Sequence, residues 1–251
     1  MQHIDLNCDM GEGMPDDLLL FPLISSANIA CGGHAGDEEL MRRSVGSAIT
    51  HGIAIGAHPS YPDRKDFGRV DLLGRTITLG ELPEILLTQL TALEEICRVE
   101  GARLHHIKLH GALYNRAAKD QAVSECVCRT IAAFNSRLFV YGLSGSVMET
   151  VAKEQGLAFV SEVFADRTYQ DDGSLTPRTA DGALIEDDSA AVHQVLYMVR
   201  QGKVKALSGR EVPLVAETLC LHGDGSHAVQ FARLIRETFR QEGILVRAPS
   251  F

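Results

Sequence analysis

Ionisable side chains follow nearly every short apolar segment of this chain. Asp9 and Glu12 come after the apolar residues at 4–6, and His58 comes directly after those at 53–57. The other members of the pattern are His34 after 27–31, Lys108 and His110 around 104–109, Asp166 and Arg167 after 159–163, and His222 and Asp224 after 218–221. Such groups can perform acid–base chemistry, bind a metal ion or hold an anionic substrate. At the carboxyl ends of successive parallel strands they are typical of the active-site end of an α/β enzyme.

Alternation within two of these segments predicts polar side chains on the inside of the fold. The polar faces consist of Asp5, Asn7 and Asp9 in the first segment and His106, Lys108 and His110 in the segment at 104–109. Successive strand residues point to opposite sides, so the apolar faces can pack on helices while these polar faces meet each other. Burying an unpaired charge costs several kcal/mol, so these groups must pair, bind a metal or bind a substrate. A polar core in which Lys108 only neutralises Asp5 or Asp9 is the alternative.

Three residues of the pattern are candidate metal ligands. Asp9, His58 and His110 offer the oxygen and imidazole donors that hold zinc, manganese or nickel and leave positions open for water. They come from three different predicted strands, so no local spacing connects them. For each histidine, a structural role as a hydrogen-bonded residue at a strand end is the alternative.

A repeated unit of helix, glycine and short apolar strand predicts the architecture. Asp37 is a typical N-cap, and Gly52 is expected to end the same helix before the strand at 53–57. Two further helices are predicted at capping boxes formed by Thr78 with Glu81 and by Ser146 with Glu149. About seven such units predict an α/β fold with a distorted parallel barrel, with an open doubly wound sheet as the alternative.

The length of the chain predicts a single domain, and two long loops are expected within it. A chain of 251 residues fits one α/β barrel, so residues 1–251 are interpreted as a single catalytic domain. Two polar stretches, 59–80 and 171–188, do not follow the repeated pattern of helix, glycine and strand. Long polar loops of this kind are candidate lids or partner surfaces.

Composition and absent motifs argue against several classes of function. The formal net charge of −9 disfavours nucleic acid or a membrane surface as a partner. The apolar runs are shorter than the roughly 20 residues that cross a bilayer, and no signal peptide is readable. The six cysteines lack C-x-x-C spacing, which favours reduced thiols and a cytoplasmic location. The phosphate loop G-x-x-x-x-G-K-[ST], the dinucleotide fingerprint G-x-G-x-x-G and the serine elbow G-x-S-x-G do not occur.

A series of motifs, in order along the chain, resembles the LamB/YcsF family. The motifs are DLNCDMGE at 5–12, NIACGGHAGD at 28–37, GAHP at 56–59, YPD at 61–63, FGR at 67–69, KLHGALYN at 108–115, EVFADR at 162–167 and HGD at 222–224. The resemblance runs from the first predicted strand to the last predicted helix.

The resemblance implies both a fold and an activity. The fold would be the distorted barrel of the glycoside hydrolase/deacetylase group. The family comprises A subunits of prokaryotic 5-oxoprolinase, which implies ATP-dependent opening of the lactam ring of 5-oxo-L-proline. The products would be L-glutamate, ADP and phosphate, and the partners would be subunits B and C. In related barrels one aspartate and two histidines hold a divalent metal ion, and Asp9, His58 and His110 match those positions.

Roles for individual residues follow from their expected convergence. We expect Asp9 or Glu12 to act as the general base, and His110 or His222 to protonate the ring nitrogen. Lys108 and Arg167 are expected to hold phosphate or the substrate carboxylate. The expected substrate-binding residues are Asn7, His34, Arg69, Glu162, Asp166, Arg167 and Asp224. Two other functions stay open: a metal-dependent deacetylase or amidohydrolase that needs no ATP, and a non-catalytic subunit that binds the substrate for its partners.

Overall fold

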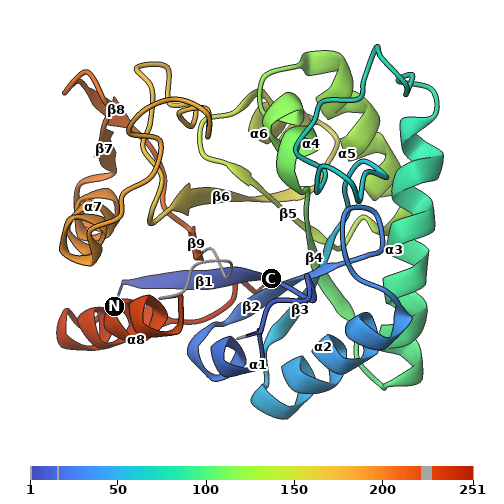
Figure 1. Ribbon diagram of the computed structural model, residues 1–251, viewed down its shortest axis with the longest axis horizontal. Coiled ribbons are helices and arrows are strands. Elements are labelled where there is room, and N and C mark those ends of the chain that lie inside the picture. Colours follow the sequence, from blue (N-terminus) through green and yellow to red (C-terminus); the bar gives the residue numbers. More distant parts are fainter. Residues whose placement is uncertain (1, 16, 222–227, 251) are drawn as a thin grey trace.

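The central feature of the fold is a closed barrel of parallel strands. The computed structural model describes residues 2–15, 17–221 and 228–250. Within these residues, β9 pairs in parallel with both β6 and β1, which closes a seven-stranded barrel in the order β1-β2-β3-β4-β5-β6-β9 (Figure 1). The strands are β1 (His3–Met10), β2 (Ser26–Ala30), β3 (Ala54–His58), β4 (Leu104–Lys108), β5 (Phe139–Leu143), β6 (Ala158–Phe164) and β9 (Thr218–Leu221). The predicted parallel barrel of about seven strands is therefore confirmed, and the open sheet is wrong.

Helices cover the outside of the barrel and connect its strands (Figure 1). They are α1 (Asp17–Leu20), the 3-10 helix η1 (Phe21–Leu23), α2 (Glu38–His51), α3 (Leu82–Val99), α4 (Gly111–Ala117), α5 (Gln121–Asn135), α6 (Val147–Glu154), α7 (Asp188–Gln201) and α8 (Ala228–Gln241). An antiparallel hairpin of β7 (Lys203–Lys205) and β8 (Glu211–Pro213) follows α7. After α8, the short strand β10 (Leu245–Val246) pairs in parallel with the beginning of β1.

Local capping explains where some of the helices begin and end. The Asp37 side chain accepts a hydrogen bond from the backbone N–H of Leu40, and Gly52 ends α2 at φ 65°, a conformation that glycine adopts without steric cost. Both predictions for this helix are confirmed. The helix predicted after the Thr78–Glu81 capping box is present and begins at Leu82. One half of the box forms, because the Glu81 carboxylate accepts hydrogen bonds from the N–H and the hydroxyl of Thr78.

The two faces of the barrel strands have opposite character. Ile4 and Leu6 in β1 are fully buried in the apolar layer between the barrel and the helices. Asp5 and Asn7 alternate with them and are equally buried, but within a polar network. The carboxylate of Asp5 accepts hydrogen bonds from Ser25, Ser26 and Thr218 at 2.6–2.8 Å. The predicted polar interior of the barrel is therefore confirmed, and most of its groups have hydrogen-bond partners.

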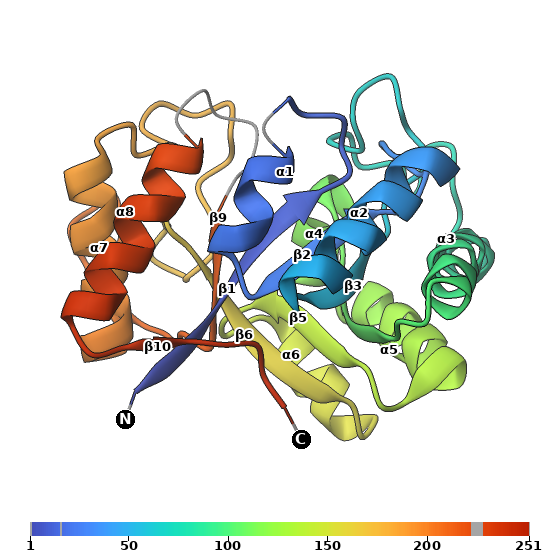
Figure 2. The ribbon, with the colours of Figure 1, turned by 90° about the horizontal axis from the view of Figure 1, so that it is seen from below.

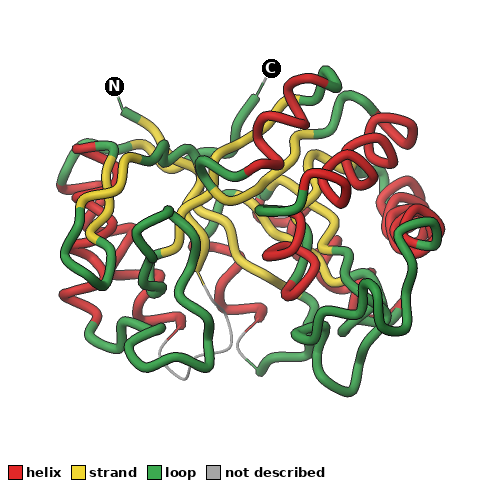
Figure 3. The backbone as a smooth tube through the Cα atoms, turned by 90° about the horizontal axis from the view of Figure 1, so that it is seen from above, coloured by secondary structure: helices red, strands yellow, loops and turns green. Residues whose placement is uncertain are grey.

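The two long loops lie at one end of the barrel, and both ends of the chain lie at the other. Figure 2 shows the loops around 59–80 and 171–188 above the carboxyl ends of the strands, and Figure 3 shows the same separation from the opposite direction. None of the helices in the described ranges combines the length and hydrophobicity needed to cross a bilayer. All six cysteines have free thiols, as predicted.

Gly56 provides a test of how tightly the barrel interior is packed. A Cβ at this position in β3 would lie 2.1 Å from Nε2 of His106, a buried ring that donates to Asn28. We expect Gly56→Ala to lower the free energy of unfolding by about 1–3 kcal/mol, because the ring has no room to move. Gly46→Ala in α2 is the matched control. Nothing lies within 4 Å of a Cβ there, so we expect a gain of about 0.5–1 kcal/mol. Urea unfolding followed by circular dichroism measures both, and equal stability of the two variants would contradict this packing.

Candidate active site

A cavity of about 960 Å³ opens at the carboxyl ends of the barrel strands. Its lining includes Asp9, Glu12, His58, Lys108 and His110, which are far apart in the sequence. The two long loops contribute further lining residues, from Phe67 and Arg69 in one and from 172–179 in the other. The convergence predicted from the strand ends is therefore found for these residues. His222 and Asp224 lie outside the described residues.

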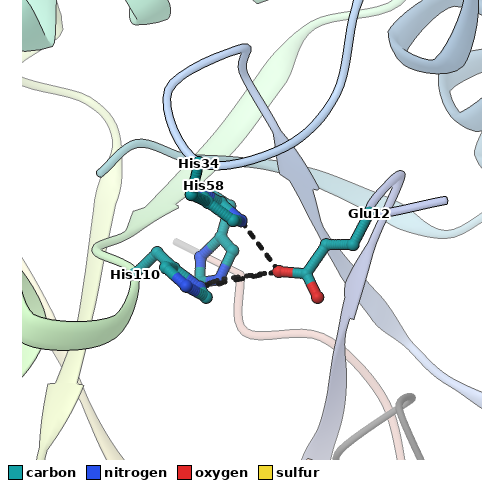
Figure 4. Close-up of side chains that lie close together, drawn as sticks. All are labelled: Glu12, His34, His58 and His110. Carbon is teal, nitrogen blue, oxygen red and sulfur yellow. Dashed lines mark hydrogen bonds and ion pairs between the residues drawn. The ribbon is translucent and has the colours of Figure 1, made fainter. Parts of the chain in front are cut away.

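Four side chains at one side of the cavity form a compact group, which we call the histidine cluster. It consists of Glu12, His34, His58 and His110, whose nitrogen and oxygen atoms lie within 4.8 Å of one another. The four side chains come from the loops or strand ends after β1, β2, β3 and β4. Figure 4 shows the imidazoles gathered in front of the Glu12 carboxylate. Its Oε1 lies 2.9 Å from His34 Nε2 and 3.5 Å from His110 Nδ1.

Backbone carbonyls fix the orientation of two of the imidazoles. His58 Nδ1 lies 2.8 Å from the carbonyl oxygen of Lys108, and His110 Nε2 lies 2.9 Å from that of Phe67. A carbonyl oxygen only accepts, so each of these ring nitrogens carries a hydrogen. The other nitrogens, His58 Nε2 and His110 Nδ1, then face each other at 2.9 Å inside the cluster. Acceptors placed behind imidazoles in this way are typical of metal-binding histidines.

The third imidazole, His34, has a hydrogen-bond acceptor at each ring nitrogen, but a neutral imidazole carries a hydrogen on only one of them. The Ser60 hydroxyl donates to the carbonyl oxygen of Tyr61, so it must accept a hydrogen bond from His34 Nδ1. His34 Nε2 then directs a lone pair at the Glu12 carboxylate, 2.9 Å away. This contact is repulsive unless a proton or a cation lies between the two atoms.

Two of the three imidazoles stay neutral, as metal ligands must. Burial and the neighbouring histidines lower the pKa of His110 to about 2. Burial and the charge of His58 likewise lower the pKa of His34 to about 3. Burial also disfavours a charge on His58, but the Asp9 carboxylate outweighs it and raises the pKa of His58 above its usual value. Three imidazole nitrogens and a carboxylate oxygen are a donor set that fits a divalent metal such as zinc or manganese.

The donor set differs in part from the one predicted. His58 and His110 belong to the cluster, whereas Glu12 and His34 were expected in other roles. Asp9 lies beside the cluster, with Oδ2 3.3 Å from His58 Nε2. Its Oδ1 accepts hydrogen bonds from Lys108 and Asn28 at 3.0 and 2.8 Å. Asp9 is thus shared between the cluster and the barrel interior.

Lys108 is a buried cation at the floor of the cavity. Its Nζ lies 3.0 Å from Asp9 Oδ1 and 2.9 Å from Glu162 Oε1, and it donates to Asn7 Oδ1 at 3.1 Å. Burial alone would lower the pKa of Lys108, but these carboxylates and Cys220 raise it well above the usual value. Asn7 and Glu162 were predicted to bind substrate. Both are fully buried and absent from the lining of the cavity, so their visible role is to hold Lys108.

Arg167 places a second buried cation in the wall of the cavity. Its Nη2 donates to the carbonyl oxygen of Thr176 at 2.6 Å, and no ion pair joins it to a carboxylate within the described residues. Burial lowers the pKa of its guanidinium from the usual value. Arg69 also lines the cavity and stacks over the Phe67 ring at 5.1 Å. Asp166, another predicted substrate-binding residue, does not line it.

Several lining residues were missed by the sequence analysis. They include Phe67, Lys119, Ser146 and Arg178. Ser146 was interpreted only as a helix cap, and the other three stand in loops without periodicity. Two signals were available: Phe67 belongs to the FGR motif at 67–69, and Ser146 closely follows the end of a strand.

The loop that carries Phe67 tests how the cluster is held. Phe67 has φ 54°, unusual for a side chain other than glycine, and Gly68 follows at φ 63°. A Cβ at Gly68 would lie 3.0 Å from both His110 and His34. We expect Gly68→Ala to weaken zinc binding about 10- to 100-fold, because the displaced rings lose their supporting acceptors.

Gly74→Ala is the matched control, since Gly74 has a similar φ of 76° but nothing within 4 Å of a Cβ. Isothermal titration calorimetry compares the two variants with the wild type. Equal zinc affinities for the two variants would show that Gly68 does not position the cluster.

Comparison with known proteins identifies the family. The LamB/YcsF family model matches residues 4–250. The chain is 46% identical over 253 residues to the 5-oxoprolinase A subunit of Tolumonas auensis, covering 99% of this chain and 100% of that protein. The crystal structure of a lactam utilization protein from Thermus thermophilus superposes with a TM-score of 0.90 at 39% identity, over 99% and 100% of the two chains. A family 4 carbohydrate esterase from Streptomyces lividans shares the fold at a TM-score of 0.50 and 12% identity, over 99% and 93% of the chains. The chain therefore belongs to the LamB/YcsF family.

Proposed function

We propose that this chain is the lactam-opening A subunit of a cytoplasmic 5-oxoprolinase, with residues 1–251 as one catalytic domain. The reaction hydrolyses 5-oxo-L-proline to L-glutamate, coupled to the conversion of ATP to ADP and phosphate, with subunits B and C as partners. One observation carries the proposal: the Asp9–Lys108 pair and the histidine cluster meet at a single cavity. The names of two relatives, a 5-oxoprolinase A subunit and a lactam utilization protein, support the substrate class.

The chemistry of the lactam accounts for the kinds of groups in the cavity. A five-membered lactam is an unstrained amide and therefore a poor electrophile. Phosphorylation of its oxygen creates a leaving group, and a positioned water can then attack the ring carbon. A divalent metal ion bound at the histidine cluster would supply Lewis acidity to a reacting oxygen.

Asp9 is the residue best placed to act as the general base. It lines the cavity, and Lys108 and Asn28 hold its Oδ1. Its Oδ2 faces the histidine cluster, where a water bound beside the substrate would lie within reach. Lys108 stays charged between two carboxylates, so its role is to fix Asp9 and to stabilise negative charge.

The geometry favours other roles for two residues that were considered for acid–base work. Glu12 and His110 are better suited to bind a metal, because their donor atoms point into the histidine cluster. The second nitrogen of His110 is already occupied by the carbonyl oxygen of Phe67. This leaves His222, which lies outside the described residues, as the candidate to protonate the ring nitrogen.

Arg167 is the proposed anchor for the carboxylate of 5-oxoproline. It is buried in the cavity wall without an ion-pair partner among the described residues, and leaving such a cation uncompensated costs several kcal/mol. A planar guanidinium binds a carboxylate through two parallel hydrogen bonds. The substrate would thus be held at one end by Arg167, with its amide directed toward Asp9.

The histidine cluster also supports a second candidate, a metal-dependent amidohydrolase that needs no ATP. Such an enzyme would open a lactam or an N-acetyl group without nucleotide, and a chelator would abolish the activity. A protein that only binds the substrate for its partners is the third candidate, in which partners B and C would cleave ATP without this chain.

A mixing experiment separates these functions. Purified chain, with and without subunits B and C, receives 5-oxoproline and ATP, and glutamate and ADP are measured together. We expect glutamate only in the complete mixture.

In the complete mixture, Asp9→Asn should lower kcat about 10²- to 10⁴-fold, because asparagine keeps the shape of the side chain but cannot act as a base. Glu211→Gln, an exposed change on the β7–β8 hairpin, is the control. Glutamate formation at the wild-type rate by Asp9→Asn would rule out the assigned base.

Arg167→Met tests the carboxylate anchor. We expect the KM for 5-oxoproline to rise about 10- to 100-fold with a much smaller change in kcat, because a charged hydrogen bond to the bound substrate is lost. Steady-state kinetics of the assembled enzyme give both constants. A KM equal to that of the wild type would mean that the carboxylate binds elsewhere.

A further inference from the structure

The cavity extends well beyond the histidine cluster, and its other half is lined by different kinds of residues. The cluster follows β1 to β4, whereas the opposite half is lined by residues after β5 and β6 and by the α4–α5 turn. This half includes Lys119, Ser144–Ser146 and the loop from Asp172 to Thr179. A small ring with one carboxylate fills only part of 960 Å³, so this half has room for another group.

Ser146 is an N-cap residue whose side chain does not cap its helix. It precedes α6 with the extended backbone of an N-cap, but its hydroxyl makes no capping hydrogen bond. Glu149 accepts instead from the backbone N–H of Gly145. The Ser146 side chain lines the cavity at 8% exposure, and its Oγ is buried without a hydrogen-bond partner among the described residues. A buried hydroxyl without a partner requires an explanation, and a bound ligand would supply one.

The turn that carries Lys119 lies next to the start of α6. The backbone N–H of Val147 donates to the carbonyl oxygen of Ala118 at 2.9 Å, which joins the start of α6 to the residue before Lys119. The Lys119 side chain is exposed and forms no ion pair within the described part of the chain. The amino end of an α-helix also favours negative charge. The N–H groups of Ser146 and Val147 are already bonded to carbonyl oxygens, so the hydroxyl and the ammonium are the main donors.

The charges of the whole lining favour an anion with more than one negative charge. The cationic side chains are Arg69, Lys108, Lys119, Arg167 and Arg178, and the carboxylates are Asp9, Glu12 and Asp172. Asp172 is the carboxylate of this half, and it is already bonded to the N–H and the hydroxyl of Ser174. A chain of net charge −9 thus has a cavity lining with an excess of cations.

We propose that Ser146, Lys119 and Arg178 form a binding subsite for a phosphate group, separate from the histidine cluster. Donors that approach from the α4–α5 turn, the start of α6 and the loop at 172–179 suit a tetrahedral dianion better than a planar carboxylate. The subsite deepens the proposed function, on which it rests for its purpose: it would hold the phosphate that leaves when a phosphorylated lactam is opened.

Binding of inorganic phosphate tests the subsite directly. The whole chain is treated with a chelator, so that no metal ion at the histidine cluster contributes, and is titrated by calorimetry at low ionic strength. We expect saturable binding that Lys119→Ala and Ser146→Ala each weaken about tenfold, because each removes a hydrogen bond to a charged group. Lys119→Arg should restore most of the affinity.

A control defines the location of the phosphate. Lys205→Ala removes an exposed lysine of the β7–β8 hairpin and should leave the affinity unchanged. A parallel titration with ADP distinguishes a free phosphate from the phosphate of a nucleotide, and either ligand should depend on Lys119. An absence of saturable phosphate binding, or equal affinity in the wild type, Lys119→Ala and Ser146→Ala, would overturn the proposal.

The result is independent of the lactam assay. Phosphate binding that depends on these residues, in a protein without lactam-opening activity, would uphold the subsite and reject the proposed function. Glutamate formation without phosphate binding would do the reverse.

Discussion

A lysine ammonium enclosed in a barrel is the constraint on which the rest of the site depends. Lys108 is 2% exposed, and removing its charge from water is costly unless carboxylates and hydrogen-bond acceptors surround it. Asp9 from β1 and Glu162 from β6 compensate the charge, while Asn7 accepts a hydrogen bond from Lys108 and donates one to Glu162. Because these residues belong to different strands, the ion pairs hold the register of the barrel and the orientation of Asp9 together.

The histidine cluster depends on a second constraint, which comes from outside the barrel. An imidazole binds a metal only when its lone pair points at the site, so something must hold the hydrogen on the other nitrogen. The carbonyl oxygen of Phe67 does this for His110, and the Ser60 hydroxyl does it for His34. Both acceptors belong to the stretch at 59–80. This loop, interpreted from the sequence as a lid or partner surface, is therefore part of the machinery that orients the cluster.

The two halves of the cavity divide the chemistry between them. The side after β1 to β4 holds the donor atoms of the histidine cluster, and the other side, formed by the α4–α5 turn and the loops after β5 and β6, holds cationic side chains and Ser146. A closed barrel makes this division possible, because neighbouring strand ends lie side by side while opposite ones face each other across the mouth. The ion pair of Asp9 and Lys108 also lines the cavity.

The amino-acid sequence by itself determined the barrel, the helix limits at Asp37 and Gly52, and the inward direction of Asp5, Asn7 and Lys108. These features follow from local rules, since strand alternation and capping depend on neighbours in the chain. Only the tertiary structure decided that Glu12 and His34 join His58 and His110, and that Ser146 lines the cavity without capping α6 by its side chain. Those side chains lie in loops beyond the strand ends, where no periodicity sets their direction. Their orientation comes from contacts with residues distant in the sequence, such as Ser60 with His34 and Phe67 with His110, which exist only once the barrel has closed.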